Sequence, residues 1–286
     1  MRRLLGANLE RLKKNKVFYA CLIVSVFYCV LVCVSIWRDT IRFDVTMSVD
    51  DALFNFMVSI GLIISLFCSL FIGTEYSDGT IRNKIVVGHV RYQIYLSYFL
   101  ICTLMGAVLY VFCLLAGFVL GIPLLGGVET ELPYLLCLLL DALLVCIVYG
   151  AIFNLIAVLS SNKAHTAVLC ILAALVLMVI GIYLYQTLQQ PETISQLVGT
   201  GEDMEISIEG ADGMDFALET VKNPHYVSGL RREIYQFFLD FLPSGQVMQI
   251  GSRTALHPYL MGVYSMIIIV VSNLAGMFFF EKKDIK

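Results

Sequence analysis

The sequence has little charge. Asp, Glu, Lys and Arg make up 14% of its 286 residues, 59% of the residues are hydrophobic, and the mean hydropathy is +0.85. Soluble domains carry about a quarter of charged residues, so this chain cannot cover its apolar side chains in one water-soluble core. It also lacks a G-x-x-x-x-G-K-[ST] stretch, the phosphate-binding loop of many ATPases. We therefore expect a membrane protein that does not bind or hydrolyse ATP by itself.

Disulfide bonds and metal sites are not expected either. All nine cysteines fall inside apolar runs, and their spacing matches no metal-binding pattern. Cysteine in such runs usually serves as a small hydrophobic residue. The sequence also shows no nucleophile paired with a base at one membrane depth. No catalytic residue, metal or bound cofactor is therefore predicted.

Six apolar runs are long enough to cross about 30 Å of hydrocarbon, which takes about 20 helical residues. The runs are 17–37, 52–73, 94–122, 134–159, 166–188 and 259–280. Backbone polar groups in lipid must be hydrogen-bonded within the protein, and the short alternating segments of a barrel are missing, so the runs are expected to be helices. The predicted fold class is an all-α integral membrane protein with six transmembrane helices.

Basic residues predict how the chain lies in the membrane. Thirteen of the 19 Lys and Arg residues fall at the two ends of the chain or in the segments that follow the second and fourth spans. Short loops rich in Lys and Arg stay in the cytoplasm, so both termini are predicted to be cytoplasmic. The predicted location is the plasma membrane. Most of the acidic residues fall on the other side, which argues against binding of nucleic acid there.

A polar segment precedes the first span. Residues 1–16 place Met1, Leu5, Leu9 and Leu12 at helical spacing, which predicts an amphipathic helix on the inner leaflet. It serves either as a membrane anchor or as a docking surface for a cytosolic partner.

The outer segment, 189–257, contains an acidic and glycine-rich stretch, 200–213, that is typical of a loop. In 229–242, apolar residues recur at helical spacing up to Pro243, which predicts a helix. Its apolar stripe consists of Leu230, Ile234, Phe237 and Phe241. This stripe is expected to be buried against the outer ends of the spans or against lipid headgroups.

The polar insert 73–98 separates the second and third spans. Asp78 and Thr80 are residue types that begin helices, and Gly88 can end one, so a short helix over 80–87 is predicted. Arg82, Asn83, Lys84 and His89 would face the cytosol, and Ile81, Ile85 and Val87 the neighbouring helices or the membrane. The alternative is an ordinary basic loop, which would not need caps and an apolar period of its own.

The same insert carries a family resemblance. Residues 75–84 (EYSDGTIRNK), followed by Gly88, Arg91 and 94–97 (IYLS), resemble the E-x-x-x-G-T-[IL]-R-[NS]-K…G…R…IYLSK pattern of ABC-2 type permeases. These are the membrane subunits of bacterial ATP-binding-cassette exporters. Tyr98 departs from the pattern, because a lysine is common at that position.

A second stretch supports the resemblance. Residues 223–229 (NPHYVSG), Arg231 and 242–246 (LPSGQ) resemble the N-P-x-Y…G…R…L-P-[ST]-G-Q pattern that precedes the last span of these permeases. The resemblance implies one ABC-2 type transmembrane domain over residues 1–286. Its parts would be an elbow helix in 1–16, spans one to five in 17–188, an extracellular segment with short helices in 189–257, and the last span with a cytosolic tail in 258–286.

The resemblance also implies partners. Two such subunits, identical or different, would form a dimer with a cytosolic ATPase docked under each, and the ATPase would bind ATP and magnesium. The insert would hold the coupling helix, with a second, smaller contact at 160–165. The residues expected to contact the ATPase are Glu75, Asp78, Thr80, Ile81, Arg82, Asn83, Lys84 and Arg91.

One clear charge lies inside a span. Asp141 is about two turns from Tyr134, hence ~10 Å from the outer surface at 1.5 Å per residue. A carboxylate at such depth is costly and faces the bundle or a wet cavity. It is either part of a substrate or proton pathway or a hydrogen-bonded structural residue. Asn55 is a second candidate for the pathway, and its alternative is a hydrogen bond between helices.

The favoured function is thus the permease subunit of an ATP-driven exporter, a non-catalytic subunit whose dimer forms the translocation pathway. The resemblance associates such subunits with antimicrobial peptides, drugs, ions and lipid-linked compounds as cargo. Two alternatives from other classes stay open: an ATP-independent channel or structural protein, and an intramembrane enzyme. The enzyme would need paired reactive groups at one depth, and only Asp141 is available.

Overall fold

Six segments of the described chain are helical, long and apolar enough to cross a membrane, which confirms the predicted spans. The structure is a computed structural model that describes residues 1–44, 47–160, 162–199 and 216–283. The spans are α2 (Lys16–Phe43), α3 with α4 (Val49–Leu53 and Met57–Ser77), α6 (Arg91–Leu125), α7 (Leu132–Leu159), α8 (Lys163–Leu188) and α11 (Pro258–Lys282). Most of these helices continue beyond the apolar runs, since flanking polar residues extend the same hydrogen-bonded turns.

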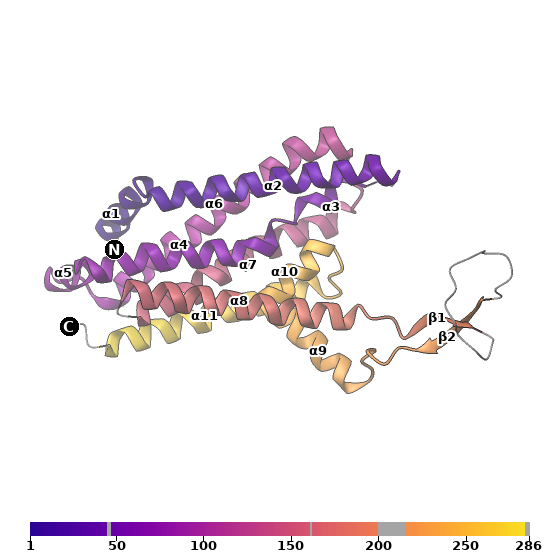
Figure 1. The fold of residues 1–286 in the computed structure, drawn as a ribbon. Helices are drawn as coiled ribbons and strands as arrows, with labels where there is room; N and C mark the ends of the chain where they lie inside the picture. The colour runs from indigo at the N-terminus through magenta and orange to yellow at the C-terminus, as the bar shows by residue number, and fades with distance from the viewer. Residues whose placement is uncertain (45–46, 161, 200–215, 284–286) are drawn as a thin grey trace.

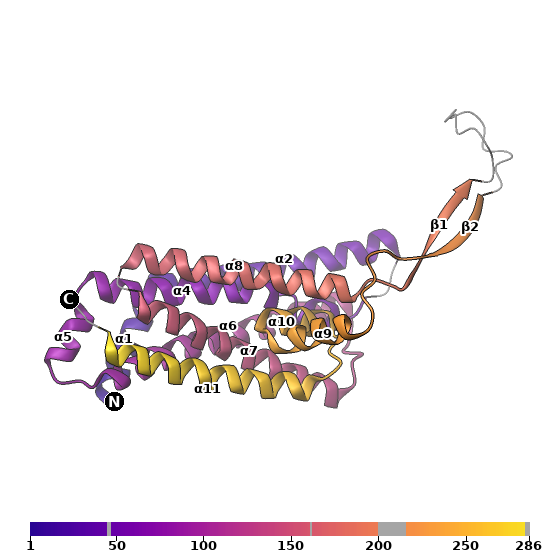
Figure 2. The same ribbon diagram turned by 90° about the horizontal axis from the view of Figure 1, so that it is seen from below.

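The helices α4 and α7 form the centre of the bundle. Figures 1 and 2 show the long helices running side by side, with α4 against α7 and α8, α7 also against α6 and α11, and α2 beside α6. Small residues allow close approach: a Cβ on Gly150 of α7 would lie 3.4 Å from the backbone of Cys102 in α6. Aromatic side chains such as Phe67, Tyr95 and Phe153 are fully buried between the helices.

The second span is interrupted near its start. A capping box between Ser48 and Asp51 starts α3, which ends at Leu53, and a turn over residues 54–56 leads into α4. The side-chain amide of Asn55 donates a 2.7 Å hydrogen bond to the backbone carbonyl of Asp51. This local bond competes with the helical pattern. The run predicted from residue 52 is therefore divided between two helices.

Both chain ends lie at one end of the bundle, together with α1 (Arg2–Lys13) and α5 (Thr80–Val86) (Figure 1). The predicted helices in 1–16 and 80–87 are thus present. The buried face of α1 differs from the predicted stripe: it consists of Leu4, Asn8 and Leu12, whereas Met1 is exposed. A polar residue occupies this face because Asn8 bonds to side chains of other helices.

The opposite end carries the segment between α8 and α11. The strands β1 (Thr193–Gly199) and β2 (Phe216–Lys222) form an antiparallel hairpin that projects from the bundle (Figure 1). The sequence did not predict this hairpin, and the loop predicted at 200–213 lies outside the described residues. The helix α9 (Leu230–Phe241) confirms the predicted helix, and α10 (Pro243–Ser252) follows it directly.

The apolar stripe of α9 is only partly buried against the spans of this chain: Phe237 and Phe241 pack against the ring of Tyr264 in α11, with ring centroids 5.8 Å and 5.7 Å apart. Leu230 is 72% exposed, Ile234 44% and Phe237 49%, whereas Leu239 and Asp240 are buried. The predicted burial against the spans therefore holds at the Phe241 end of the stripe and not at Leu230 and Ile234. The helix turns its polar side inward because α10 offers amide side chains for hydrogen bonding. Contact of the stripe with lipid headgroups stays a prediction.

Candidate coupling site

A buried carboxylate joins four helices at the end of the bundle that carries α1 and α5, called the inner end below; the opposite end is called the outer end (Figure 1). Glu75 lies in the last turn of α4 and is 3% exposed. One carboxylate oxygen pairs with Arg11 of α1, and the other accepts hydrogen bonds from Lys84 of α5 at 2.6 Å and from the hydroxyl of Tyr98 of α6. Paired cations and hydrogen bonds offset the cost of burying the charge. Both carboxylate oxygens of Glu75 are bound by residues of this chain and the side chain is buried, so the prediction that Glu75 contacts an ATPase directly is wrong.

Further hydrogen bonds hold the cations of this cluster in place. Arg11 donates to the backbone carbonyl of Phe71 at 2.7 Å and lies over the ring of the same residue, 4.3 Å from its centroid. Lys84 also donates to the side chain of Asn8 at 3.1 Å, and Asn8 donates to Ser97 at 3.0 Å. Burial lowers the pKa of Lys84, and the charge of the neighbouring carboxylate opposes that shift. The arrangement ties α1, α4, α5 and α6 together.

The short helix α5 has one inward and one outward face. Inward are Ile81, which is 1% exposed, and Lys84, so the expectation that Lys84 faces the cytosol is wrong. The outward face consists of four exposed residues, Arg82, Asn83, Val86 and Val87. Val86 and Val87 are 78% and 76% exposed, so Val87 does not pack against the neighbouring helices of this chain, and no sequence signal singled out Val86. An apolar tip beside a cation is a surface that a groove on another protein can cover.

The remaining predicted contact residues divide in the same way. Asp78 is exposed at the end of α4, next to Gly79, whose φ of 67° turns the chain sharply into α5. Thr80 is partly buried and donates a 3.2 Å hydrogen bond to the backbone carbonyl of Glu75. Asp78, Arg82 and Asn83 are thus the predicted residues that remain accessible.

Arg91 is used inside the chain as well. From the start of α6 it donates to the last carbonyls of α11, at 2.8 Å to Glu281 and 2.5 Å to Lys283. Lys283 donates in turn to the backbone carbonyls of Val158 and Ser160, at 2.9 Å and 2.8 Å, where α7 ends. Cations at helix C-termini satisfy free carbonyls and the negative end of the helix dipole. Arg91 and Lys283 thus fix the ends of α6, α7 and α11 at this side of the bundle, and contact of Arg91 with the ATPase stays a prediction.

A second charged cluster, which the sequence did not indicate, lies at the opposite end of the bundle. Asp50 of α3 is fully buried and accepts hydrogen bonds from the backbone nitrogens of Glu129 and Thr130, both at 2.8 Å. Arg253, just after α10, pairs with Asp51 and lies 3.7 Å from Asp50. This outer clasp joins α3, the loop between α6 and α7, and the end of α10.

The two candidate pathway residues belong to different contacts. Asn55 bonds to its own turn at α3, as described above. Asp141 is 5% exposed and faces α11, where a Cβ on Gly262 would lie 2.9 Å from one carboxylate oxygen. Its other oxygen has no hydrogen-bond partner among the described residues. The structure thus places Asp141 at a tight contact between α7 and α11 without a hydrogen-bond network.

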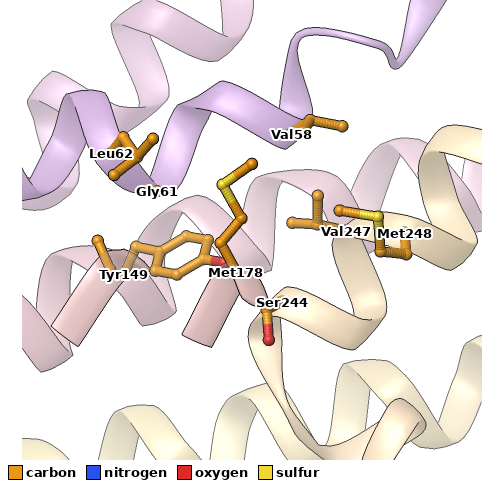
Figure 3. A pocket seen from close by; sticks show the side chains of 9 residues that line it. Val58, Gly61, Leu62, Tyr149, Met178, Ser244, Val247 and Met248 are labelled. Carbon is orange, nitrogen blue, oxygen red and sulfur yellow. The ribbon is translucent and has the colours of Figure 1, made fainter. Parts of the chain in front are cut away.

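Figure 3 shows a small pocket where α10 enters the bundle. It is lined by Gly61 of α4, Tyr149 of α7, Met178 of α8 and Ser244 of α10, among others. A Cβ on Gly61 would lie 2.9 Å from the Tyr149 ring, so the glycine makes room for that ring. The buried hydroxyl of Ser244 has no partner among the described residues. The pocket is a packing feature in the middle of the fold, remote from the inner cluster around Glu75.

The family follows from a direct comparison. The family model described as "ABC-2 family transporter protein" matches residues 4–181, which is more than half of the chain and includes the Glu75 cluster. The chain therefore belongs to the ABC-2 family of transporter proteins. A comparison with curated proteins gives no match. Family membership and the six spans make this chain a multi-pass membrane component of an ABC transporter, and imply an ATP-binding-cassette partner.

Proposed function

We propose that this chain is the non-catalytic permease subunit of an exporter, and that α5 is the coupling helix on which a separate cytosolic ATPase acts. All 286 residues would form one transmembrane domain with both termini in the cytoplasm, and two subunits would form the translocation pathway. ATP and magnesium would be bound by the ATPase alone. The observation that carries the proposal is the two-faced α5: an exposed apolar tip outside and a buried ion pair to three other helices inside.

The mechanism requires a difference in binding. ATP must favour one arrangement of the two ATPases, and that arrangement must contact α5 differently, because a ligand shifts an equilibrium only by its differential affinity. A displacement of α5 would be transmitted to α1, α4 and α6. Lys84 of α5 binds the Glu75 carboxylate of α4, and Arg11 of α1 and Tyr98 of α6 bind the same carboxylate.

The test is co-purification of the chain with an ATP-binding-cassette ATPase encoded beside it. Val87→Glu places a carboxylate in the proposed apolar contact, and should lower the amount of bound ATPase by roughly tenfold or more. Val128→Glu is the matched control, because Val128 is exposed at the opposite end of the bundle and should leave binding unchanged. Equal binding by both variants would contradict the proposed role of α5. ATP binding by the purified permease without its partner would contradict the assignment of nucleotide to the ATPase.

A further inference from the structure

A polar cavity lies at the outer end of α8, between α8, α9 and α10. Its volume is about 220 Å³, and its lining includes Tyr185, Leu188, Arg232, Gln236, Gln249 and Leu256. A cavity of about 150 Å³ already admits a molecule the size of benzene, so this one can hold a small organic group. Neither the family match, which ends at residue 181, nor the proposed coupling mechanism accounts for it.

Arg232 provides a cation that is not neutralised. It forms no ion pair with a described residue, and its guanidinium donates only to backbone carbonyls, at 3.0 Å to Leu188 and 3.5 Å to Val227. The ring of Tyr226 lies 5.2 Å from the guanidinium and fixes its position. A guanidinium has five N–H donors in a planar fork that suits phosphate, so a phosphate group can use the donors that the carbonyls leave free.

The other side of the cavity favours a positive group. Asp240 is 4% exposed and draws the amide nitrogens of Gln236 and Gln249 toward itself, at 2.8 Å and 2.9 Å. His257 faces the second carboxylate oxygen at 3.1 Å. Because both NH₂ groups point to Asp240, the amide oxygens remain as acceptors. Among the described residues, the one contact to either oxygen is a 3.5 Å contact from Gln236 to Gln249. Acceptors above a buried carboxylate attract an ammonium group.

The surroundings are those of a membrane interface. Leu256, on the rim of the cavity, is 68% exposed, and the exposed apolar stripe of α9 lies on the face opposite to Arg232 and Gln236. Tyr183 and Tyr235 bridge α8 and α9 with ring centroids 6.4 Å apart. Tyrosines at a span end and an amphipathic helix with an exposed apolar face are typical of the headgroup region.

We propose that this cavity binds the headgroup of an aminophospholipid, with the phosphate at Arg232 and the ammonium at Gln236 and Gln249 above Asp240. Arg232 and Gln236 are four residues apart on one helix, so their Cβ atoms are about 5–6 Å apart. One phosphoethanolamine group, whose two charges are joined by a two-carbon linker, can therefore contact both side chains. The acyl chains would leave along the exposed apolar residues of α8, such as Val179 and Tyr183.

The test uses the full-length chain purified in detergent and native mass spectrometry with titrated dioleoylphosphatidylethanolamine. Saturable binding is expected, and Arg232→Gln should weaken it about tenfold, because it removes the charged fork that holds the phosphate. Arg231→Gln is the matched control, since its side chain is exposed and lines no part of the cavity. Arg232→Lys should give an intermediate affinity. An unchanged size-exclusion profile of this variant would show that the weaker binding does not come from loss of folding.

The probes distinguish the sources of the headgroup chemistry. Dioleoylphosphatidic acid, which has no ammonium, should bind several-fold more weakly to the wild type, and Gln236→Leu should remove that difference. Equal binding of both lipids to the wild type would overturn the proposal. So would equal binding of phosphatidylethanolamine by Arg232→Gln and the wild type, or binding of soluble phosphoethanolamine as tight as that of the lipid, which would point to a water-soluble ligand. No ATPase takes part in this experiment, so its outcome is independent of the proposed coupling.

Discussion

Removing the carboxylate of Glu75 should destabilise the inner end of the bundle more than the removal of any exposed charge nearby. Glu75→Ala leaves Arg11 and Lys84 without their partner, and breaking a buried pair costs about 3–5 kcal/mol. The side chain of Lys84 is 18% exposed and that of Arg11 is 30% exposed, so both regain part of their hydration. We therefore expect the lower end, about 3 kcal/mol, which corresponds to a fall in melting temperature of roughly 6–12 °C for a chain of this size.

A double-mutant cycle tests whether this loss arises from the pair. Lys84→Met alone leaves Glu75 paired with Arg11 and should be the milder change. Glu75→Ala combined with Lys84→Met should cost less than the sum of the two, by about 1–2 kcal/mol, because no unpaired Lys84 remains. Glu10→Ala is the control, since its pairing with Lys13 is between exposed side chains and should leave the melting temperature unchanged.

The assay is thermal unfolding of the full-length chain in detergent, followed by stimulation of the partner ATPase at a temperature where every variant is folded. If the two substitutions are additive, or if Glu75→Ala melts with the wild type, then the carboxylate does not hold the inner end together. A stable Glu75→Ala protein with normal stimulation of the ATPase would also refute the link between α5 and the other helices.

Three further predictions concern other contacts. Gly181→Ala would place a Cβ 2.8 Å from the backbone of Ser244, and should lower the melting temperature through about 1–3 kcal/mol of overpacking, whereas Gly6→Ala, with nothing within 4 Å, should not. Burial lowers the pKa of Lys283 from 10.5 to about 8, so its acylation by an amine-reactive ester should level off above about pH 8. Because the unfolded chain binds this proton more tightly, Lys283 should add stability as the pH rises from about 8 toward 10.5; a reaction rate that keeps rising to pH 10.5 would contradict both statements. Asp50→Asn removes the negative charge from the oxygen that accepts three hydrogen bonds and faces Arg253, and should cost about 2 kcal/mol, measured by thermal unfolding, with an unchanged melting temperature as the contrary result.

The spans could be predicted because length and apolarity alone decide whether a helix can cross the hydrocarbon. The short helix after the second span was also readable, since its end residues are types with a local preference for helix ends. The turn at residues 54–56 was not, because Asn55 sits in an apolar run and its local hydrogen bond exists only in the folded chain. The hairpin of β1 and β2 was missed because the sequence around it shows loop composition.

The sequence predicted where in the chain the candidate site lies, but not which of its residues face outward and which face the other helices. In the sequence, Arg82 and Lys84 are equivalent cations two residues apart. On a helix with 3.6 residues per turn they point to nearly opposite sides, so one is exposed and the other meets Glu75. A motif shows which residue types recur together, and it does not separate residues that contact a partner from residues that hold the motif in place. Glu75 and Lys84 pair with each other and with residues of α1 and α6, which is the second role.

The two charged clusters lie at the two ends of the same span, which has a mechanical consequence. Glu75 is in the last turn of α4, and the outer clasp holds α3, which precedes α4 across one turn. The 21 residues of α4 span about 30 Å and pack against α7 and α8 along the way, so the helix resists bending. Under the proposed function, a push on α5 that moves Glu75 must therefore move α4 as a rod, and that motion reaches the contact between Asp51 and Arg253 only through the turn at residues 54–56. The break at residues 54–56 is the point where that motion can be absorbed, because the turn there is not held by a continuous helical ladder.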